Sequence, residues 1–447
     1  MPPRRTSPTL TAGLVRIRQL FHRTIQSNPL PPGTLAVGVG LLITGASAYG
    51  FLAVAARAID TIEYARLSVL WALALLVGPG FFLPLEQEAA RAVASRRARG
   101  LGGGPALRRA AMLGAGFVAL LVVTAMIFNG PLLDRLLDGD VALFAGFLLS
   151  LGGYFALHLT RGALSGNGRF KAYSTSLAGE GLLRLGACLA LAVAGVSGAG
   201  AYGLVLGLAP FGAVALALRG QRELARPGPE AAWTELSSVL GWLLAGSVLA
   251  QVLVNAGPVA VKLLATEAET AEAGRFLAAL IVARVPLFLF AAVQAALLPA
   301  LAATVANGRL DDFRRGLWRL LAVVAGAGAV GTVGAFAIGP SVVTLFFGAE
   351  LALGRVDLVL LAAASAAYMV AMALSQALIA LSCPARMAMA WLAGTIAFAV
   401  VTALGNDLLL RTELGVVAGS AVAAACMGVF LAASLRGMPA TAARSPG

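Results

Sequence analysis

The stretch Ala-Leu-Ser-Gly-Asn-Gly-Arg-Phe at residues 163–170 returns in weakened form 217 positions later, as Ala-Leu-Ser-Cys-Pro-Ala-Arg-Met at residues 380–387. The same offset carries the tripeptide Leu-Arg-Gly from 218–220 to 435–437. Two matches at one spacing indicate that the second half of the chain is a diverged copy of the first. In a chain this hydrophobic, the repeat predicts two copies of one membrane unit.

Composition points to the same class of protein. The chain has 447 residues, of which 60% are hydrophobic and 12% charged, and its mean hydropathy is +0.89. Soluble globular proteins carry about 25% charged residues. The start, residues 2–30, is basic and lacks the apolar core and small-residue cleavage site of a signal peptide. We therefore expect the membrane spans to act as their own insertion signals.

Apolar runs between charged segments define the expected spans. A helix needs about 20 apolar residues to cross the hydrocarbon core. Twelve runs qualify, at 34–56, 67–85, 110–130, 141–160, 173–195, 200–218, 236–261, 275–300, 317–340, 357–381, 388–405 and 414–435. The predicted fold is an all-α polytopic membrane protein with about twelve transmembrane helices in two parallel six-helix lobes.

The repeat and the spans together predict how the chain is divided. Each half has an even number of spans, so the repeats are expected to be parallel, related by a pseudo-twofold axis along the membrane normal. The expected parts are a basic cytoplasmic N-terminal segment, an N-lobe, a cytoplasmic linker, a C-lobe and a cytoplasmic tail, at 1–33, 34–220, 221–235, 236–437 and 438–447. Within the first part, residues 9–26 fit either a helix lying on the inner leaflet or a disordered basic tail, and both interpretations stay open.

The distribution of charge predicts the orientation. With the N-terminus inside, most of the 33 Lys and Arg residues fall in cytoplasmic segments and most acids fall outside. Positive residues are retained in the cytoplasm during insertion, so both termini are expected there. The net charge of +13 is then explained by topology and by attraction to anionic lipid headgroups. A nucleic-acid partner is not expected, because no basic stretch belongs to a soluble fold.

Loops of the two halves also correspond. The first long cytoplasmic loop, 86–109, is rich in arginine, and its counterpart is expected at 301–316. Each follows a Leu-Pro pair near the inner end of a span, at Pro84 and at Pro299. In the outer loops, Arg57 and Arg66 correspond to Lys262 and Arg275. Because the loop features lie 205 to 215 positions apart, the duplication extends beyond the two short matches.

Motifs of enzymes and metal sites are missing from the sequence. There is no Walker A stretch, and the only histidines are His22 and His158. The three cysteines have no metal-ligand spacing, and the pair Asp311-Asp312 is typical of a solvated helix start. His158 is best explained as a packed or interfacial residue. We expect no enzyme activity, no cofactor and no metal site.

Charged residues inside spans are the first candidates for a functional site, because burying them in lipid is costly. Glu180 and Arg184 lie four residues apart on one helix face and form either a packing pair or part of a site. Arg284 has no acid nearby on its own helix, so it needs a partner on another helix, a water-filled cavity or an anionic substrate, and the cavity is favoured. At the 217-residue offset, Glu180 and Arg184 align with Ala397 and Val401, so these charges are not shared by the two halves.

The seventh span has a polar face. Gln251, Asn255 and Lys262 share that face, with Gly257-Pro258 between them weakening the backbone hydrogen bonds. The pattern favours a bent helix lining a polar pathway, and the alternative is an interhelical hydrogen bond with Lys262 reaching the outer surface. The cations expected around the outer mouth are Arg57, Arg66, Lys262 and Arg275.

Three stretches give the chain a resemblance to a known family: 57–64 (Arg-Ala-Ile-Asp-Thr-Ile-Glu-Tyr), 84–88 (Pro-Leu-Glu-Gln-Glu) and 166–170 (Gly-Asn-Gly-Arg-Phe). With twelve spans in two parallel halves, residues 34–437 resemble Wzx-type polysaccharide flippases of the multidrug/oligosaccharidyl-lipid/polysaccharide (MOP) exporter superfamily. The resemblance implies a V-shaped, alternating-access flippase in the bacterial inner membrane. Such a protein moves polyprenyl-(pyro)phosphate-linked oligosaccharides to the outer leaflet for cell-surface polysaccharide synthesis.

The resemblance also implies partners and a site. The partners would be the lipid-linked glycan, the bilayer and the glycosyltransferases or polymerase of the same pathway, and the flippase would be a monomer. A cationic cavity would bind the anionic headgroup, which assigns that role to Arg284, Arg184, Arg57, Arg66, Lys262 and Arg275, with Gln251, Asn255 and Glu180 as polar pathway residues.

Three other functions are weighed against the flippase. A cation-coupled multidrug exporter of the same superfamily typically has carboxylates in its first and seventh spans, and 34–56 and 236–261 contain none. A peptidoglycan-precursor flippase usually has fourteen spans. A membrane-embedded glycan polymerase or ligase needs a large external loop, which is missing here. The sequence leaves the glycan, the lipid carrier and any driving ion open.

Overall fold

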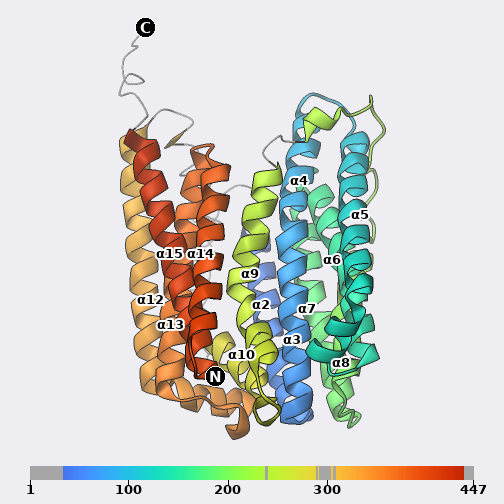
Figure 1. The fold of residues 1–447 in the computed structure, drawn as a ribbon. Helices are drawn as coiled ribbons and strands as arrows, with labels where there is room; N and C mark the ends of the chain where they lie inside the picture. The colour runs from blue at the N-terminus through green and yellow to red at the C-terminus, as the bar shows by residue number, and fades with distance from the viewer. Residues whose placement is uncertain (1–33, 237–239, 288–289, 291–303, 306–308, 437–447) are drawn as a thin grey trace, which may run out of the picture.

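The computed structural model describes residues 34–236, 240–287, 290, 304–305 and 309–436, and every regular element in these ranges is helical. Eleven helices of the described part are long and apolar enough to cross a membrane. Figure 1 shows the long helices standing side by side, as expected for a multi-pass membrane protein. The predicted all-α polytopic fold class is confirmed.

The elements follow the order of the expected spans. Those of the first half are α2 (Thr34–Ala58), α3 (Thr61–Val77), η1 (Gly78–Phe82), α4 (Leu83–Ala98), α5 (Gly104–Ile127), η2 (Pro131–Leu136), α6 (Val141–Gly166), α7 (Phe170–Val193) and α8 (Ala199–Leu218). Those of the second half are η3 (Trp233–Glu235), α9 (Leu240–Leu264), η4 (Glu267–Glu269), α10 (Glu272–Ala283), α12 (Leu310–Phe347), η5 (Ala349–Leu351), α13 (Arg355–Ala380), α14 (Pro384–Leu404) and α15 (Leu408–Arg436).

Eleven of the twelve predicted spans fall on these long helices. The eighth, 275–300, begins as α10, but residues 288–289 and 291–303 lie outside the described part, as do Pro299, the N-terminal 1–33 and the tail from 437.

The predicted loop 86–109 is largely helical, and a helix also begins within the described part of the predicted loop 301–316, so both loop predictions were wrong. The stretch 86–109 contains the end of α4 and the start of α5, and α12 begins at Leu310 inside 301–316. A helix satisfies its backbone hydrogen bonds internally, so it can continue past the apolar run into water. A charged stretch therefore marks the end of the membrane span but not the end of the helix.

The opening repeat lies at two identical helix ends. After α6, Gly168 N–H donates to Ser165 and Arg169 N–H to Leu164; after α13, Ser382 N–H donates to Ile379 and Cys383 N–H to Leu378. Both patterns are Schellman caps.

The residue that turns the chain at each cap has a positive φ, 71° at Gly168 and 58° at Ser382. These positions lie 214 residues apart. The sequence match at an offset of 217 residues is therefore displaced by three residues from the structural repeat. In the structural register, Glu180 and Arg184 correspond to Gly394 and Phe398, so both charges still lack a charged counterpart in the second half.

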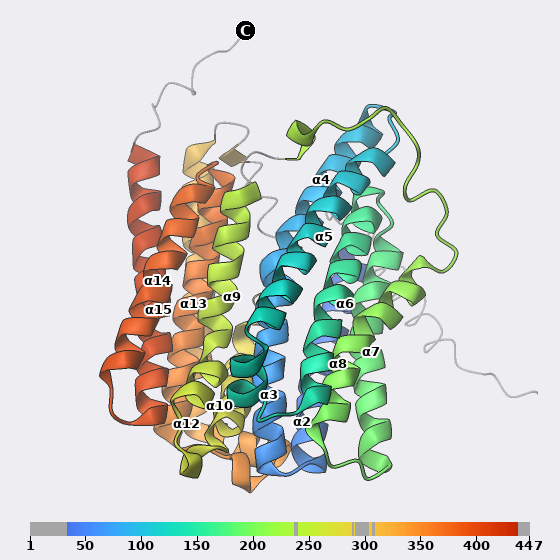
Figure 2. The ribbon, with the colours of Figure 1, turned by 45° about the vertical axis from the view of Figure 1, so that its right-hand side comes forward.

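The two halves are arranged on either side of a central group of helices. In Figure 1, α12–α15 stand on the left, α4–α8 on the right, and α9 and α10 between them. Contacts between the halves run mainly from α3 to α9 and α10. Figure 2 shows the segment after α8 passing outside α5 and α6 and over the ends of α4 and α5 before it reaches η3 and α9. The division into lobes at 220 and 236 stays a prediction.

Candidate functional site

A cavity of about 330 Å³ lies between the two halves, enclosed by α2, α3, η1, α9, α10 and α13. Its lining combines aromatic rings, amides and one cation. The residues that supply these groups are Tyr49, Trp71, Phe290, Tyr368, Gln251, Asn255 and Arg284. The sequence prediction named three of these, Arg284, Gln251 and Asn255, and the fold brings all three together.

Arg284 is the cation of the cavity. It is the C-cap residue of α10 and is only 9% exposed. One guanidinium nitrogen, NH1, lies 3.4 Å from Asn255 Oδ1, whereas NH2 has no hydrogen-bond partner in the described part of the chain. Asn255 Nδ2 in turn donates to Gln251 Oε1 at 2.9 Å. No ion pair joins Arg284 to a carboxylate among the residues that the structure describes, so its charge is available to a ligand.

The aromatic walls are held in place by the backbone. Tyr49 Oη donates to Ile281 O at 3.0 Å, and Tyr368 Oη donates to Ala250 O at 3.3 Å. Trp71 stacks on Phe51 with ring centroids 5.5 Å apart. These contacts fix the rings before any ligand arrives, so the cavity can present flat apolar faces beside a cation.

Arg184 lies behind one wall of this cavity and does not line it. Its guanidinium carbon is 5.0 Å from the Trp71 ring, and NH1 donates to Glu180 Oε1 at 2.9 Å. The other Glu180 oxygen accepts from Arg161 NH2 at 3.3 Å, and all three side chains are buried. Glu180 is therefore shared by two arginines. The sequence missed Arg161 because it lies just beyond the predicted end of the fourth span.

A second polar contact in the first half was also missed. His158 Nδ1 lies 2.7 Å from Glu86 Oε2, and Tyr173 Oη donates to Glu86 Oε1 at 2.8 Å. Glu86 and His158 are both 5% exposed. Glu86 was assigned to a cytoplasmic loop, but α4 carries it into the bundle. His158 is a buried partner of Glu86, which agrees with its expected packing role.

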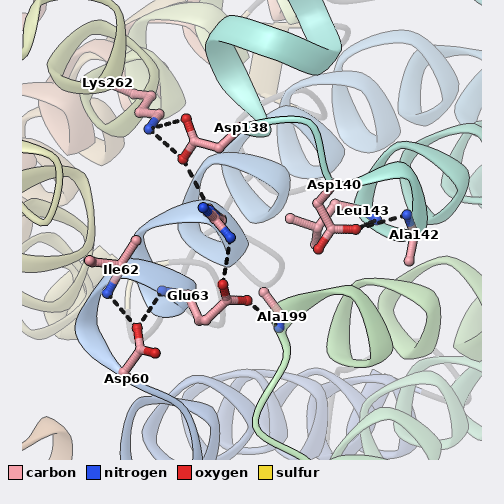
Figure 3. A network of polar contacts seen from close by, with 10 residues as sticks. Asp60, Ile62, Glu63, Asp138, Asp140, Ala142, Leu143, Ala199 and Lys262 are labelled. Atoms are coloured by element: carbon pink, nitrogen blue, oxygen red, sulfur yellow. Dashed lines mark hydrogen bonds and ion pairs between the residues drawn. The ribbon is translucent and has the colours of Figure 1, made fainter. Parts of the chain in front are cut away.

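Two predicted mouth cations meet at one carboxylate (Figure 3). Lys262 Nζ lies 2.8 and 2.7 Å from the two oxygens of Asp138, and Arg66 Nε donates to Asp138 Oδ2 at 3.1 Å. Arg66 also pairs with Glu63, whose other oxygen accepts from Ala199 N–H at 2.7 Å. Asp138 has a φ of 49° in the turn after η2, a conformation that aspartate tolerates better than most residues.

The other two mouth cations lie elsewhere. Arg57 donates from Nε to Phe346 O at 3.2 Å, near the end of α12. Arg275 pairs with Glu272 at 2.8 Å and donates to Glu350 O at 2.9 Å. None of the four predicted mouth cations is among the residues that line the Arg284 cavity. Each of them has a partner within the protein.

Glu413 is a further buried acid that the sequence prediction did not select. It is fully buried in α15, and neither carboxylate oxygen has a hydrogen-bond partner among the described residues. The predicted twelfth span began at 414, so this glutamate was counted as part of a loop. Within the described part of the chain, no group of three or more His, Cys, Asp and Glu residues is placed to hold a metal ion.

Relatives in sequence are mycobacterial. No protein-family model matches the chain. It is 28% identical over 411 residues to uncharacterized protein Rv1510 of Mycobacterium tuberculosis, an alignment covering 89% of this chain and 91% of the relative. It is 27% identical over 417 residues to uncharacterized protein Mb3654 of Mycobacterium bovis, covering 90% and 91% respectively.

Similar solved structures are transporters. An inward-facing multidrug resistance MATE family transporter of the MOP superfamily matches with a TM-score of 0.70 at 11% identity, covering 91% of this chain and 99% of that one. An outward-facing structure with otherwise the same description matches with a TM-score of 0.58 at 12% identity, covering 90% and 96%. A MOP superfamily transporter from Pyrococcus furiosus, described as having a binding pocket of reversed polarity, matches with a TM-score of 0.62 at 12% identity, covering 90% and 95%. The chain therefore has the fold of the MOP-superfamily transporters.

Proposed function

We propose that the chain is an alternating-access flippase that moves a polyprenyl-(pyro)phosphate-linked oligosaccharide from the inner to the outer leaflet, for cell-surface polysaccharide synthesis. One observation carries the proposal: the buried guanidinium of Arg284 lies in a cavity between the two halves and has no carboxylate partner in the described part. An arginine inside the membrane region without a counter-ion is costly, and an anionic ligand offsets that cost.

The chemistry of the lining suits a phosphorylated sugar. A guanidinium offers planar paired donors that match phosphate oxygens. The amides of Gln251 and Asn255 can exchange hydrogen bonds with sugar hydroxyls, and the rings of Trp71, Tyr49 and Tyr368 supply flat apolar faces. The polyprenyl chain would remain in the bilayer while the headgroup crosses between the halves.

The contacts at the Lys262 end support an inward-open assignment. Lys262 of the second half and Arg66 of the first half share Asp138, which ties the halves together at the end that charge distribution predicts to be external. The higher TM-score to the inward-facing structure points the same way. In this proposal the protein lies in the bacterial inner membrane as a monomer, with both termini cytoplasmic, and works with the glycosyltransferases or polymerase of its pathway.

A cation-coupled multidrug exporter is the second candidate, because the similar solved structures include multidrug resistance transporters. An organic cation requires negative charge or a polar anionic wall at its site. The residues that line the cavity include Arg284 and no Asp or Glu, which argues against that substrate class here. A peptidoglycan precursor has the same polyprenyl-pyrophosphate group, so the chemistry of the cavity suits it equally. It is therefore tested as an alternative substrate.

Binding and translocation test the proposal separately. Purified protein is titrated with undecaprenyl pyrophosphate and with uncharged undecaprenol, and bound lipid is counted by native mass spectrometry. Loss of one charge-assisted contact corresponds to roughly 10- to 100-fold weaker binding. We expect Arg284→Ala to lose this affinity for the pyrophosphate but not for undecaprenol, and Arg284→Lys to lose less. Arg222→Ala is the control and should bind normally, because its side chain is exposed and lines no part of the cavity.

Translocation is measured in proteoliposomes with fluorescently labelled undecaprenyl-pyrophosphate disaccharide and with a labelled peptidoglycan precursor. Equal binding of both undecaprenyl lipids, or unchanged translocation by well-folded Arg284→Ala, would overturn the role of Arg284. Transport of the peptidoglycan precursor alone would replace the oligosaccharide with that substrate.

A further inference from the structure

A second and larger cavity, of about 670 Å³, lies beside the first turns of α5 and shares no lining residue with the Arg284 cavity. Its walls come from α5, from Leu159 of α6 and from the segment 225–231 that leads toward the second half. The lining includes two arginines, Arg108 and Arg109. This end of α5 is the end that charge distribution predicts to be cytoplasmic.

The wall formed by the connecting segment is fixed in place. Arg96, which is 1% exposed, donates to both oxygens of Glu235 at 2.9 Å and also to Pro229 O. Desolvation would raise the pKa of the Glu235 carboxyl, but the hydrogen bonds and charge of Arg96 outweigh it and lower the pKa below its ordinary value. Glu235 is therefore ionised at neutral pH.

Further contacts bring the segment against α5. Arg109 lies 4.6 Å above the Trp233 ring and donates to Ala231 O at 3.2 Å. Gly104 N–H donates to Arg226 O at 2.9 Å. At Gly102, a Cβ atom would lie 2.0 Å from Pro227 O, so only glycine permits this approach. The cavity is thus formed before any ligand binds.

The charge of the cavity comes from its guanidinium groups. Arg108 has no hydrogen-bond or ion-pair partner among the described residues, and its side chain is exposed to the cavity that it lines. Arg109 contacts a carbonyl and a ring. The lining contains one acid, Glu230. The balance is therefore one net positive charge. The helix amides add little, because Gly104 N–H is already bonded and Pro105 has none.

The rest of the lining is apolar and continues toward the hydrocarbon. Leu107 and Met112 of α5 and Leu159 of α6 form this part. Met112 is 53% exposed, and the same helix exposes further large apolar residues toward its other end, at Leu120, Val123, Met126 and Ile127. A ligand that fills the cavity would have its anionic part at the arginines and its apolar part along α5.

We propose that this cavity binds an anionic phospholipid of the inner leaflet, with its phosphate at Arg108 and Arg109 and an acyl chain over Leu107 and Met112. Basic pockets at the cytoplasmic ends of transmembrane helices are suited to such headgroups. A free phosphate would leave the apolar part of the cavity unused, and a zwitterionic lipid would add its own cation beside the two arginines. The bound lipid would be a lasting component of the first half, distinct from any transported substrate.

The test compares lipids on the full-length protein. Delipidated protein is titrated with dioleoyl phosphatidylglycerol, with dioleoyl phosphatidylcholine and with inorganic phosphate, and bound lipids are counted by native mass spectrometry. We expect one phosphatidylglycerol site that binds at least tenfold more tightly than phosphatidylcholine. Arg108→Gln should weaken that site by roughly tenfold. Arg319→Gln, which removes an exposed arginine of α12 outside the cavity, should leave it unchanged.

A second variant tests the apolar part without touching charge. Met112→Asn should weaken phosphatidylglycerol binding while leaving the melting temperature unchanged, because Met112 is exposed. Equal weakening by the two arginine variants would mean general electrostatic attraction and would overturn the site. Equal binding of both lipids would do the same. Competition by inorganic phosphate at concentrations matching the lipid would make the cavity a free-anion site and not a lipid site. If any of these predictions for the lipid cavity fails, the conclusions from the Arg284 experiments are unaffected.

Discussion

Lys262 and Asp138 form an ion pair 2.7 Å long that joins α9 to the turn after η2. The Lys262 side chain is 7% exposed, and Asp138 also accepts from Arg66 of α3. One carboxylate therefore holds cations from both halves at one end of the molecule. In the alternating-access cycle proposed above, this contact would have to break whenever that end opens, so its strength would set part of the balance between the two conformations.

Removing the carboxylate is expected to favour opening at this end. Asp138→Asn leaves Lys262 and Arg66 as neighbouring cations without their shared anion, and Lys262→Met removes the link from the other side. Spin labels at the exposed residues Ile62 and Leu264, in a background with the three native cysteines replaced by alanine, report the distance between the halves. Both variants should shift the distance distribution to longer values.

Asp134→Asn is the matched control, because Asp134 is an exposed acid of η2 without a partner in the described part. It should keep the distribution of the parent protein. The same distribution in all three variants would show that the pair does not hold this end closed.

Glu180 is expected to be the most sensitive position of its cluster. Glu180→Gln leaves Arg161 and Arg184 buried without a counter-ion, whereas Arg184→Met leaves the pair of Glu180 with Arg161 intact. Breaking a buried pair by removing one partner costs about 3–5 kcal/mol. We expect Glu180→Gln to lower the unfolding temperature in detergent clearly more than Arg184→Met does. An equal or larger loss for Arg184→Met would contradict the sharing of Glu180 between two arginines.

The buried charges also show where sequence reasoning reaches its limit. The run of apolar residues was enough to predict the long helices, because the need for about 20 residues to cross the bilayer constrains sequence directly. It gave no information on which cations meet which acids. Arg161 and Glu86 fell just outside the predicted spans, although both are buried. Glu180 and Arg184 were correctly paired from their spacing. Arg161, the third residue of the cluster, lies on α6 and reaches Glu180 only through tertiary packing.

The cations at the outer loops illustrate the same limit. Their repeat positions suggested one ring, but the fold distributes them over separate contacts with Asp138, α12 and η5. Loop length and helix packing decide those distances, and neither is encoded in a local pattern. The sequence repeat at an offset of 217 residues likewise located the corresponding parts of the two halves but not their register. The two helix caps that it marks are 214 residues apart.

Glu413 is expected to respond to substitution in the opposite way to Glu180. Its carboxyl group is fully buried, and neither oxygen has a partner among the described residues, so an unpaired charge at this position would be costly. Glu413→Gln replaces that acid with a neutral group of the same shape. The unfolding temperature should stay the same or rise, while Glu413→Lys should lower it. A loss as large as that of Glu180→Gln would instead mean that Glu413 is ionised and paired with a bound cation.

The packing of α6 against α8 gives a prediction in which two alanine substitutions have opposite effects. A Cβ atom at Gly146 would lie 2.5 Å from Gly203 O, and one at Gly207 would lie 2.5 Å from Gly146 O, so the two helix backbones touch here. Gly116, on α5, has no heavy atom within 4 Å of its Cβ position. Alanine is about 1 kcal/mol better than glycine inside a helix, whereas overpacking typically costs 1–3 kcal/mol.

Gly116→Ala should therefore leave the unfolding temperature unchanged or raise it slightly, and Gly146→Ala should lower it because α6 and α8 are forced apart. Both variants are heated in detergent, and the fraction that remains folded is measured by size-exclusion chromatography under the same conditions. A stabilising Gly146→Ala would mean that the two helices can separate by several tenths of an ångström without loss, and that helix propensity outweighs close packing at this contact.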